Sequence, residues 1–431
     1  MTSASVILFG TEIASVAWDP DRQLGLFEYA PAFLRSGIEV SPIHLPLGEG
    51  VFQFPDLPRE TFKGLPGLLA DCLPDKFGNL LIDQWLARQG RSPASFNPVE
   101  RLCYLGSRAM GALEFLPAQH PAHPDRELEI EALVRLANTI LTDRGKLRTT
   151  LVPKHEEDAL ADILRVGTSA GGARAKAVIA WNPGTREVRS GQVPLPDGFE
   201  PWLIKFDGVA GNADKELADP LGFGRIEFAY HLMARASGIT MSDCHLLEEN
   251  GRAHFMTRRF DRTPDGDKLH QQTLCALGHY DFNQAGGYSY EQAFHIARRL
   301  GLHQPDLTEL YRRALFNILA RNQDDHTKNI SFLMDRKGTW RLAPAYDVTY
   351  AWNPDGLWTN RHQMSFNGKR DDFTRDDLLA AATAADVKPR KAKDIIAQLQ
   401  DTLQNWPGFA KKAGLTEKTT KALATIFRRL K

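Results

Sequence analysis

The feature that most constrains the fold is a short acidic segment, residues 322–329, that reads Asn-Gln-Asp-Asp-His-Thr-Lys-Asn. Apolar residues recur before it at the three- and four-residue spacing of an amphipathic helix. Asp306, with Glu309 three residues later, has the spacing of a helix cap, so we expect the helix to begin there and to end where the acidic segment begins. The polar side chains of the acidic segment would therefore be held at the C-terminal end of this helix.

A β-hairpin is predicted directly after the acidic segment. The runs 330–334 and 339–342 are short and apolar, and the turn Lys337-Gly338 lies between them. A further aspartate, Asp347, ends the following Ala-Pro-Ala-Tyr-Asp sequence. The order of helix, polar loop, hairpin and aspartate is typical of a phosphotransferase catalytic loop and its metal-binding partner.

Phosphoryl transfer to a hydroxyl assigns candidate roles to these residues. A carboxylate must orient the hydroxyl and accept its proton, and oxygen ligands must hold Mg²⁺ against the phosphates. Protein kinases place an Asn five residues after the catalytic Asp, and Asp324 and Asn329 have that spacing. We expect Asp324 to be the base, Asn329 and Asp347 to be metal ligands, and Lys328 to steady the transferred phosphate.

The acidic segment alone leaves other interpretations open. Asp325 has no definite role from its spacing, and His326 is a further candidate nucleotide contact. A solvated loop whose carboxylates cap and bind water would have the same composition. Two carboxylates and one histidine also suit a metal hydrolase. The remainder of the chain must separate these alternatives.

A glycine-rich segment upstream is the first candidate phosphate-binding element. Residues 166–179 include Ser169-Ala170-Gly171-Gly172-Ala173 before a predicted strand at 177–181. Glycines let the backbone approach a polyphosphate, and its N–H groups bind the oxygens. Most such runs are ordinary turns, so the segment needs support from its neighbours.

A lysine inside the apolar strand 202–206 supplies that support. Burial of the Lys205 ammonium is costly unless an anion pairs with it, and nucleotide phosphate is the natural candidate. Glu227, which we expect to open the next helix, is positioned to pair with Lys205 as in kinases. Alternatively, Lys205 extends to water and Glu227 only favours the helix dipole.

The segment between the predicted sheet and the helical part of the chain is a candidate adenine site. Two runs, 244–247 and 254–262, are expected to pair as strands, and Arg258 and Phe260 lie within the second run. Arg259, Asp261 and Arg262 are predicted to form a structural cluster of ion pairs.

Composition excludes several classes of protein. The chain has 431 residues, of which 42% are hydrophobic and 25% charged, so it suits two or three packed units. Its formal net charge is zero, so no overall field favours nucleic acid or membrane. The four cysteines are scattered, and no signal peptide or membrane-spanning run is recognised. We therefore expect reduced cysteines and a cytoplasmic protein.

The predicted fold class is α+β, in three parts. Residues 1–120 contain runs expected to be strands, at 6–9, 12–18, 24–29 and 40–47. Residues 121–265 hold the glycine-rich segment, and residues 266–431 are mainly helical with the catalytic and metal-binding loops. From residue 387 onward, eleven basic residues outnumber three acidic ones, which suits either an acidic partner or a solvated helix face.

Taken together in this order, the motifs resemble the HipA-type serine/threonine kinases, the toxins of bacterial toxin–antitoxin pairs. The resemblance spans nearly the whole chain and rests on five motifs: Ser169-x-Gly-Gly-Ala-x-x-Lys176, Leu-Ile-Lys205, Arg-Phe-Asp-Arg262, Asp324-x-His-x-Lys-Asn329 and Tyr-Asp347.

The resemblance implies a kinase-like two-lobed fold preceded by a small β-rich N-terminal domain. It also implies ATP and Mg²⁺ as cofactors, Asp324 as the base, self-phosphorylation at Ser169, and an aminoacyl-tRNA synthetase, typically the glutamyl one, as substrate. A helix-turn-helix antitoxin would bind the toxin and bring it to operator DNA. Thr168 is adjacent to Ser169, so either hydroxyl is available, and Arg258 stands where some relatives have an acidic residue.

Two further functions are compatible with the motifs. One is a catalytically idle relative that acts as a partner or corepressor of a DNA-binding antitoxin, and the other is a small-molecule kinase. The intact set Lys205, Asp324, Asn329 and Asp347 argues against the idle form, since loss of any member would mark it.

Overall fold

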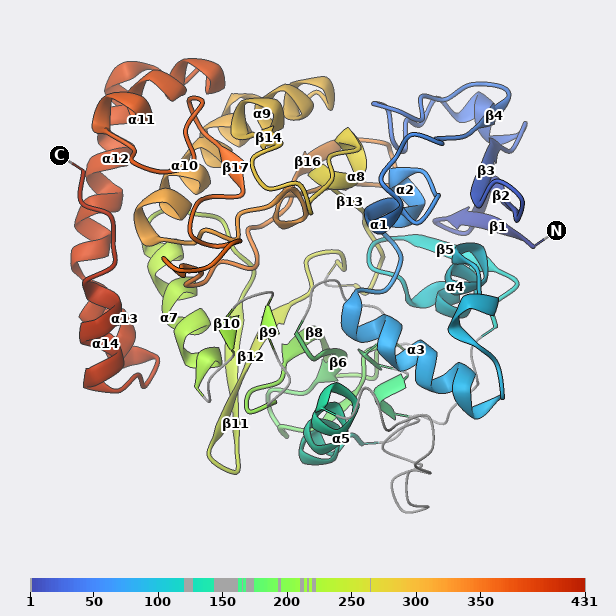
Figure 1. The fold of residues 1–431 in the computed structure, drawn as a ribbon, viewed down its shortest axis with the longest axis horizontal. Helices are drawn as coiled ribbons and strands as arrows, with labels where there is room; N and C mark the ends of the chain where they lie inside the picture. Colours follow the sequence, from blue (N-terminus) through green and yellow to red (C-terminus); the bar gives the residue numbers. More distant parts are fainter. Residues whose placement is uncertain are drawn as a thin grey trace.

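The computed structural model describes residues 2–119, 127–142, 162–164, 166–167, 174–192, 195–209, 213–214, 217–218, 222–263 and 265–430. It shows a β-rich N-terminal part, a second sheet and a helical part, drawn from blue to red in Figure 1. No helix among these residues has the length and apolar character needed to cross a membrane.

A five-stranded sheet forms the N-terminal part, in the order β4-β3-β2-β1-β5. Buried and exposed residues alternate along the first strand, as expected for a sheet with one covered face. The strands are β1 (Ser3–Leu8), β2 (Thr11–Asp19), β3 (Leu24–Tyr29), β4 (Val51–Phe52) and β5 (Leu113–Leu116).

The strand predicted at 40–47 is wrong. The segment makes a single bridge between Ser41 and Leu45, and the sheet is completed instead by β4. Pro42 and Pro46 interrupt the segment, and because proline has no N–H it removes the donors that a strand pairing needs.

Short helices connect β4 to β5, and the last of them packs against β1, β2 and β5. Asp75 caps the longest of them by accepting a hydrogen bond from Gly78 N at 2.6 Å. The helices are α1 (Arg59–Phe62), α2 (Gly67–Ala70), α3 (Lys76–Arg88) and α4 (Pro98–Leu105).

The second sheet has the order β11-β12-β8-β6-β7 and carries α7 (Phe223–Ala236) and α5 (Ile130–Thr142) beside it. The predicted pairing of the strands around 244–247 and 254–262 is confirmed. The strands are β6 (Lys176–Trp181), β7 (Val188–Ser190), β8 (Glu200–Lys205), β11 (Cys244–Glu249) and β12 (Arg252–Arg258), and the short pair β9 (Ala213–Asp214) and β10 (Leu217–Ala218) follows β8.

The helical part surrounds a three-stranded sheet, β13-β15-β16, which contains the predicted hairpin. Its strands are β13 (His270–Thr273), β15 (Ser331–Met334) and β16 (Trp340–Leu342), and β14 (Tyr288–Ser289) pairs with β17 (Met364–Ser365) nearby. Its helices are α8 (Leu274–Gly278), α9 (Tyr290–Arg299), α10 (Gln304–Ala320), α11 (Arg375–Ala381), α12 (Pro389–Gln404), α13 (Trp406–Lys412) and α14 (Glu417–Ala424).

One predicted helix boundary in this part is wrong. Helix α10 begins at Gln304, after His303, and Asp306 is not its cap. Glu309 instead pairs with Arg313, one turn later, at 2.9 Å. The pattern of a capping box is therefore present in the sequence, but the chain enters the helix three residues earlier, where Pro305 suits the first turn.

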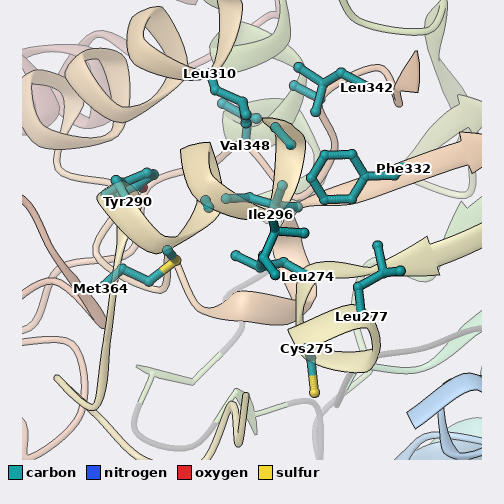
Figure 2. Packing of buried hydrophobic residues seen from close by; sticks show 14 of the residues in the cluster. Leu274, Cys275, Leu277, Tyr290, Ile296, Leu310, Phe332, Leu342, Val348 and Met364 are labelled. Atoms are coloured by element: carbon teal, nitrogen blue, oxygen red, sulfur yellow. The ribbon is translucent and has the colours of Figure 1, made fainter. Parts of the chain in front are cut away.

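One continuous hydrophobic core joins the N-terminal sheet to the helical part, because buried residues from β1 to α14 belong to the same cluster. Figure 2 shows its centre, where Ile296, Leu310 and Phe332 approach one another from α9, α10 and β15. Burial on this scale stabilises the fold by about 25 cal/mol for each square ångström of apolar surface. The core therefore fixes the hairpin and the acidic segment that precedes it.

Candidate active site

Lys205 lies at the end of β8 and is the centre of the candidate site. Its Nζ is 2.5 Å from Glu227 Oε1 and also contacts Asp347 Oδ1. The Lys205 side chain is 11% exposed and that of Glu227 is 2% exposed. The ion pair therefore offsets the cost of burying the lysine charge, as the sequence predicted. One residue thus connects the second sheet, α7 and the loop after the hairpin.

Glu227 is not the first residue of its helix, as predicted, because α7 begins at Phe223. The carboxylate therefore has no special relation to the helix terminus, and the dipole interpretation is wrong. The predicted pairing with Lys205 is confirmed. A second cation, Arg174, lies with its Nη1 4.0 Å from Glu227 Oε2 and its guanidinium over the Phe223 ring.

Asp347 is held in an uncommon backbone conformation, with φ of 51°. Non-glycine residues rarely adopt this left-handed region, and functional sites are where such strain is tolerated. Burial opposes its ionisation, but Lys205 first and then Lys176 hold the pKa of Asp347 below its usual range. The carboxylate is therefore ionised and suited to a cation.

The acidic segment places Asp324 and Asn329 against each other. Asn329 Nδ2 donates to the backbone oxygen of Asp324 at 2.8 Å. Because the amide nitrogen of Asn329 makes this bond, the amide oxygen of Asn329 points away from the Asp324 backbone oxygen. Trp358, from the irregular stretch after Asp347, donates its indole N–H to Asp324 Oδ1 at 2.6 Å. The candidate base is therefore oriented by a residue that the sequence did not indicate.

Asp325, left without a role by the sequence, is buried and structural. Its Oδ2 accepts from Tyr290 Oη and lies 2.8 Å from His362 Nδ1, and its Oδ1 accepts from Gln363 N at 2.8 Å. These bonds attach the acidic segment to α9 and to the 348–373 stretch. They fix the backbone beside Asp324.

His326 and Lys328 both lie against Phe282. Lys328 Nζ is 4.8 Å from the centre of its ring, and the His326 ring centre is 5.5 Å from it. His326 Nε2 is 3.9 Å from Asp324 Oδ2. His326 is thus near the candidate base, and Lys328 shares the same phenylalanine ring with His326.

The candidate adenine segment follows β12. Arg258 Nη2 lies 3.5 Å from Glu200 Oε1 on the neighbouring strand. The Arg258 side chain is therefore engaged in an ion pair and is not reserved for a nucleotide. The Phe260 ring packs on Tyr346 with centres 5.6 Å apart, and its side chain joins a small apolar cluster. Backbone atoms are therefore the groups that this segment offers to a ligand.

The predicted ion-pair cluster beside it is confirmed. Asp261 is buried and pairs with Arg259 at 2.6 Å and with Arg262 at 2.9 Å. Asp261 Oδ2 also accepts from Gly111 N at 2.7 Å, so the cluster connects the second sheet to the N-terminal part. Burial opposes ionisation of Asp261, but the two guanidiniums hold its pKa below the usual range.

The glycine-rich residues Ser169 to Ala173 lie outside the described residues. Their described neighbours surround Lys205. Lys176, which opens β6, is the Cα partner of Lys205 in the antiparallel pairing of β6 with β8. The strand that follows the loop therefore begins next to the candidate phosphate site.

The donor set suits a magnesium ion bound together with a nucleotide. Among the described residues, no group of three or more His, Cys, Asp and Glu side chains converges as a metal cage would require. Mg²⁺ bound with phosphates needs only one or two protein carboxylates, since phosphate oxygens and water complete its shell. The ionised Asp347 and the free amide oxygen of Asn329 meet that requirement.

Sequence reasoning missed three contributors to this region. Trp358 stands in an irregular stretch without periodicity, and Asp71 and Asp75 stand in a turn-rich segment, 64–78. Asp71 accepts from Thr273 N at 2.7 Å and from its hydroxyl at 2.8 Å. Asp75 lies 3.6 Å from Lys176. A Leu-Pro-Asp sequence before a helix indicates a cap, and only the fold shows what else it contacts.

Comparisons with known proteins point in one direction. The model of the HipA-like C-terminal domain matches residues 168–406, and that of the HipA N-terminal domain matches residues 4–116. "Putative kinase Y4mE" of Sinorhizobium fredii is 26% identical over 371 residues, which cover 83% of this chain and 73% of that protein. "Putative kinase Y4dM" of the same organism is 27% identical over 186 residues, 39% of this chain and 44% of its own length.

The structure of the Shewanella oneidensis HipA, in a complex of HipA, HipB and operator DNA, is similar with a TM-score of 0.68 and 18% identity. The similarity covers 98% of this chain and 94% of that one. It confirms the predicted fold class, a kinase-like two-lobed α+β body preceded by a β-rich N-terminal part.

Proposed function

The chain belongs to the HipA family of kinase-like proteins, and from that premise we propose that it is an ATP-dependent serine/threonine protein kinase and the toxin of a toxin–antitoxin pair. One observation carries the proposal. Lys205 contacts Glu227 and Asp347 together, which is the arrangement that an active kinase needs to hold nucleotide phosphates and the metal.

The reaction follows from the positions of the side chains. A substrate hydroxyl at Asp324 is oriented by the carboxylate and gives up its proton to it. The hydroxyl oxygen forms a bond to the γ-phosphorus while the bond from that phosphorus to the bridging oxygen breaks, and ADP leaves. ATP supplies the phosphoryl group, and Asn329 and Asp347 would hold a Mg²⁺ ion, which would neutralise the phosphate charge.

The remaining candidates have roles around that centre. Lys205 holds the phosphates, and Lys328 and His326 lie beside the transferred group. Backbone atoms of 258–260 receive the adenine, and the loop 169–173 covers the phosphates. In domain terms, residues 1–120 form the N-terminal domain, 121–265 the lobe with the glycine-rich loop and 266–431 the lobe with the catalytic segment.

Self-phosphorylation at Ser169 is part of the proposal. A phosphate in the phosphate-binding loop adds about two negative charges, which would repel ATP and displace the loop. Mass spectrometry of the purified protein is expected to find the modification at Ser169 and to lose it in Ser169→Ala. Full modification at Thr168 in that variant would contradict the assignment.

Substrate and partner are proposed from the family. An aminoacyl-tRNA synthetase of the glutamyl type is the proposed acceptor. The Shewanella oneidensis HipA is in a complex with HipB and operator DNA, which supports a HipB-like helix-turn-helix antitoxin as partner and contact with DNA through it. Phosphoproteomics with and without expression of this chain tests the acceptor.

The decisive experiment measures phosphate transfer from radiolabelled ATP with Mg²⁺. Asp324→Asn is expected to lower kcat by a factor of about 10² to 10⁴, because it removes the general base, while ATP binding persists. Asp355→Asn is the matched control, since Asp355 is exposed in the stretch that carries Trp358. A wild-type chain that binds no ATP, or an Asp324→Asn variant with full activity, would overturn the proposal.

A further inference from the structure

Two lysines, Lys176 and Lys205, stand directly opposite each other on the neighbouring strands β6 and β8. Residues opposite each other in an antiparallel pair point to the same face of the sheet. Like charges in that arrangement repel, and burial of each ammonium increases the cost. The pair is stable only if each lysine has a carboxylate of its own.

Lys205 has Glu227 from α7, whereas Lys176 is matched by a residue from a different part of the chain. Asp75 Oδ2 lies 3.6 Å from Lys176 Nζ, and the two side chains are 4% and 3% exposed. The other oxygen of Asp75 accepts from Gly78 N at 2.6 Å and caps α3. The cap fixes the orientation of the carboxylate and directs its second oxygen at the lysine.

The segment that carries Asp75 is itself fixed to the helical part. Asp71 accepts two hydrogen bonds from Thr273, and Gly67 N donates to His279 Nε2 at 3.1 Å. Asp75 therefore stands between a segment that is fixed to the helical part and the helix α3 that it caps.

We propose that Asp75, a residue of the N-terminal domain, is a positioning residue of the nucleotide site that holds the Lys176 ammonium at the phosphate-binding end of β6. The N-terminal domain then completes the kinase site and is more than an appended module. The inference rests on the proposed function, because it assigns a second phosphate-site cation and its holder to that same site.

Electrostatics support this placement. Lys176 stands opposite Lys205, and the Lys205 ammonium contacts Asp347, so the charge of Lys176 lies close to the proposed metal ligand. A lysine released from Asp75 would pair more fully with Asp347 and compete there with Mg²⁺. Burial raises the pKa of Asp75 to about 7 although Lys176 opposes this shift, so loss of the Asp75 charge should weaken ATP binding most clearly above that pH.

The test is Asp75→Asn in the full chain. Asparagine is an equally good helix cap of the same size, so the change removes the charge alone. We expect the KM for ATP to rise roughly tenfold, within the range of a pairwise coupling, with a change in kcat of less than about twofold. Asp75→Glu, which keeps the charge, should restore most of the affinity. The affinity for a fluorescent ATP analogue, measured by direct binding, should fall in the order wild type, Asp75→Glu, Asp75→Asn.

The control is Asp83→Asn. Asp83 lies on α3, the helix that Asp75 caps, and its ion pair is with Arg101 of α4, at 2.9 Å, rather than with a residue of the candidate site. A double-mutant cycle separates positioning from structure: in a Lys176→Met background, Asp75→Asn should have no further effect on ATP affinity. Additive effects, or an unchanged KM in Asp75→Asn, would overturn the inference. If Asp75→Asn does not fold, the same cycle uses Asp75→Ser, which keeps a capping oxygen without the charge.

Failure of the two proposals is distinguishable. Absence of transfer by the wild-type chain contradicts the proposed function. Normal transfer by the wild-type chain, together with unaltered ATP affinity in Asp75→Asn, contradicts only the role of Asp75.

Discussion

Lys205 Nζ lies 2.5 Å from Glu227 Oε1, and this pair connects the second sheet to α7 inside the protein. Glu227 is almost completely buried, so either charge left alone would lack both water and a partner. The position of α7 against the sheet and the position of the Lys205 ammonium are consequently set by the same contact.

Glu227→Gln is expected to lower kcat/KM for ATP by about 10- to 100-fold, because breaking one partner of a buried charge pair costs several kcal/mol. Lys205 would then pair with Asp347 alone and draw that carboxylate away from the metal. Steady-state kinetics measure the loss. Glu248→Gln is the control, because its pair with Arg225 is largely exposed and such pairs contribute about 0–1 kcal/mol. Equal activity of the two variants would refute the role of Glu227.

Trp358→Phe removes the indole N–H that donates to Asp324 Oδ1, while an aromatic ring remains at this position. A hydrogen bond to a charged group contributes about 1.5–3 kcal/mol, so we expect kcat to fall by roughly tenfold or more. The KM for ATP should stay constant, because Trp358 orients the base and not the nucleotide. Trp352→Phe, in the same stretch but packed on Arg321, should have kinetics close to wild type. A rise in kcat for Trp358→Phe would show instead that the indole blocks the base.

Gly67→Ala tests the attachment of the N-terminal part. A Cβ at Gly67 would lie 2.2 Å from the backbone oxygen of Ala276, and a backbone neighbour does not move aside easily. We expect a loss of roughly 1–3 kcal/mol in the free energy of unfolding, as for other overpacked sites, measured by denaturant titration. Gly48→Ala is the control, because the nearest atom there is 3.8 Å away. Equal stability of the two variants would contradict the close contact.

Acid should weaken the attachment of the N-terminal part to the helical part, because His279 accepts the hydrogen bond from Gly67 N. Burial, with a smaller effect from His44, lowers the pKa of His279 from 6.5 to about 3. Between these values the unfolded chain binds a proton that the folded chain does not, so stability is retained above about pH 6.5 and is lost as the pH falls through this window.

His279→Gln is therefore expected to reduce the loss of stability between pH 7.5 and pH 5 by about 1–2 kcal/mol. Denaturant titrations at the two pH values measure the difference. His295→Gln, at an exposed position of α9, should leave the pH dependence as in wild type. An unaltered pH dependence in His279→Gln would remove this histidine from the acid response.

Local patterns predicted much of the fold. The hairpin β15–β16, the pairing of β11 with β12 and the first three strands follow from short-range alternation and turn residues. The predictions for 40–47 and for the start of α10 were wrong for a local reason as well, because proline removed donors in one case and suited an earlier helix start in the other. Such signals operate over a few residues, and boundaries depend on which of them dominates.

The sequence by itself determined which chemistry is available: carboxylates, an amide and a lysine in the order of a kinase, with a buried lysine that required an anion. Only the tertiary structure decided which residues hold that set in place. Asp75 lies 101 positions from Lys176, and Trp358 lies 34 positions after Asp324, yet each pair is in contact. No local pattern reports such contacts, because they arise when one hydrophobic core brings distant segments together and makes buried charges find partners.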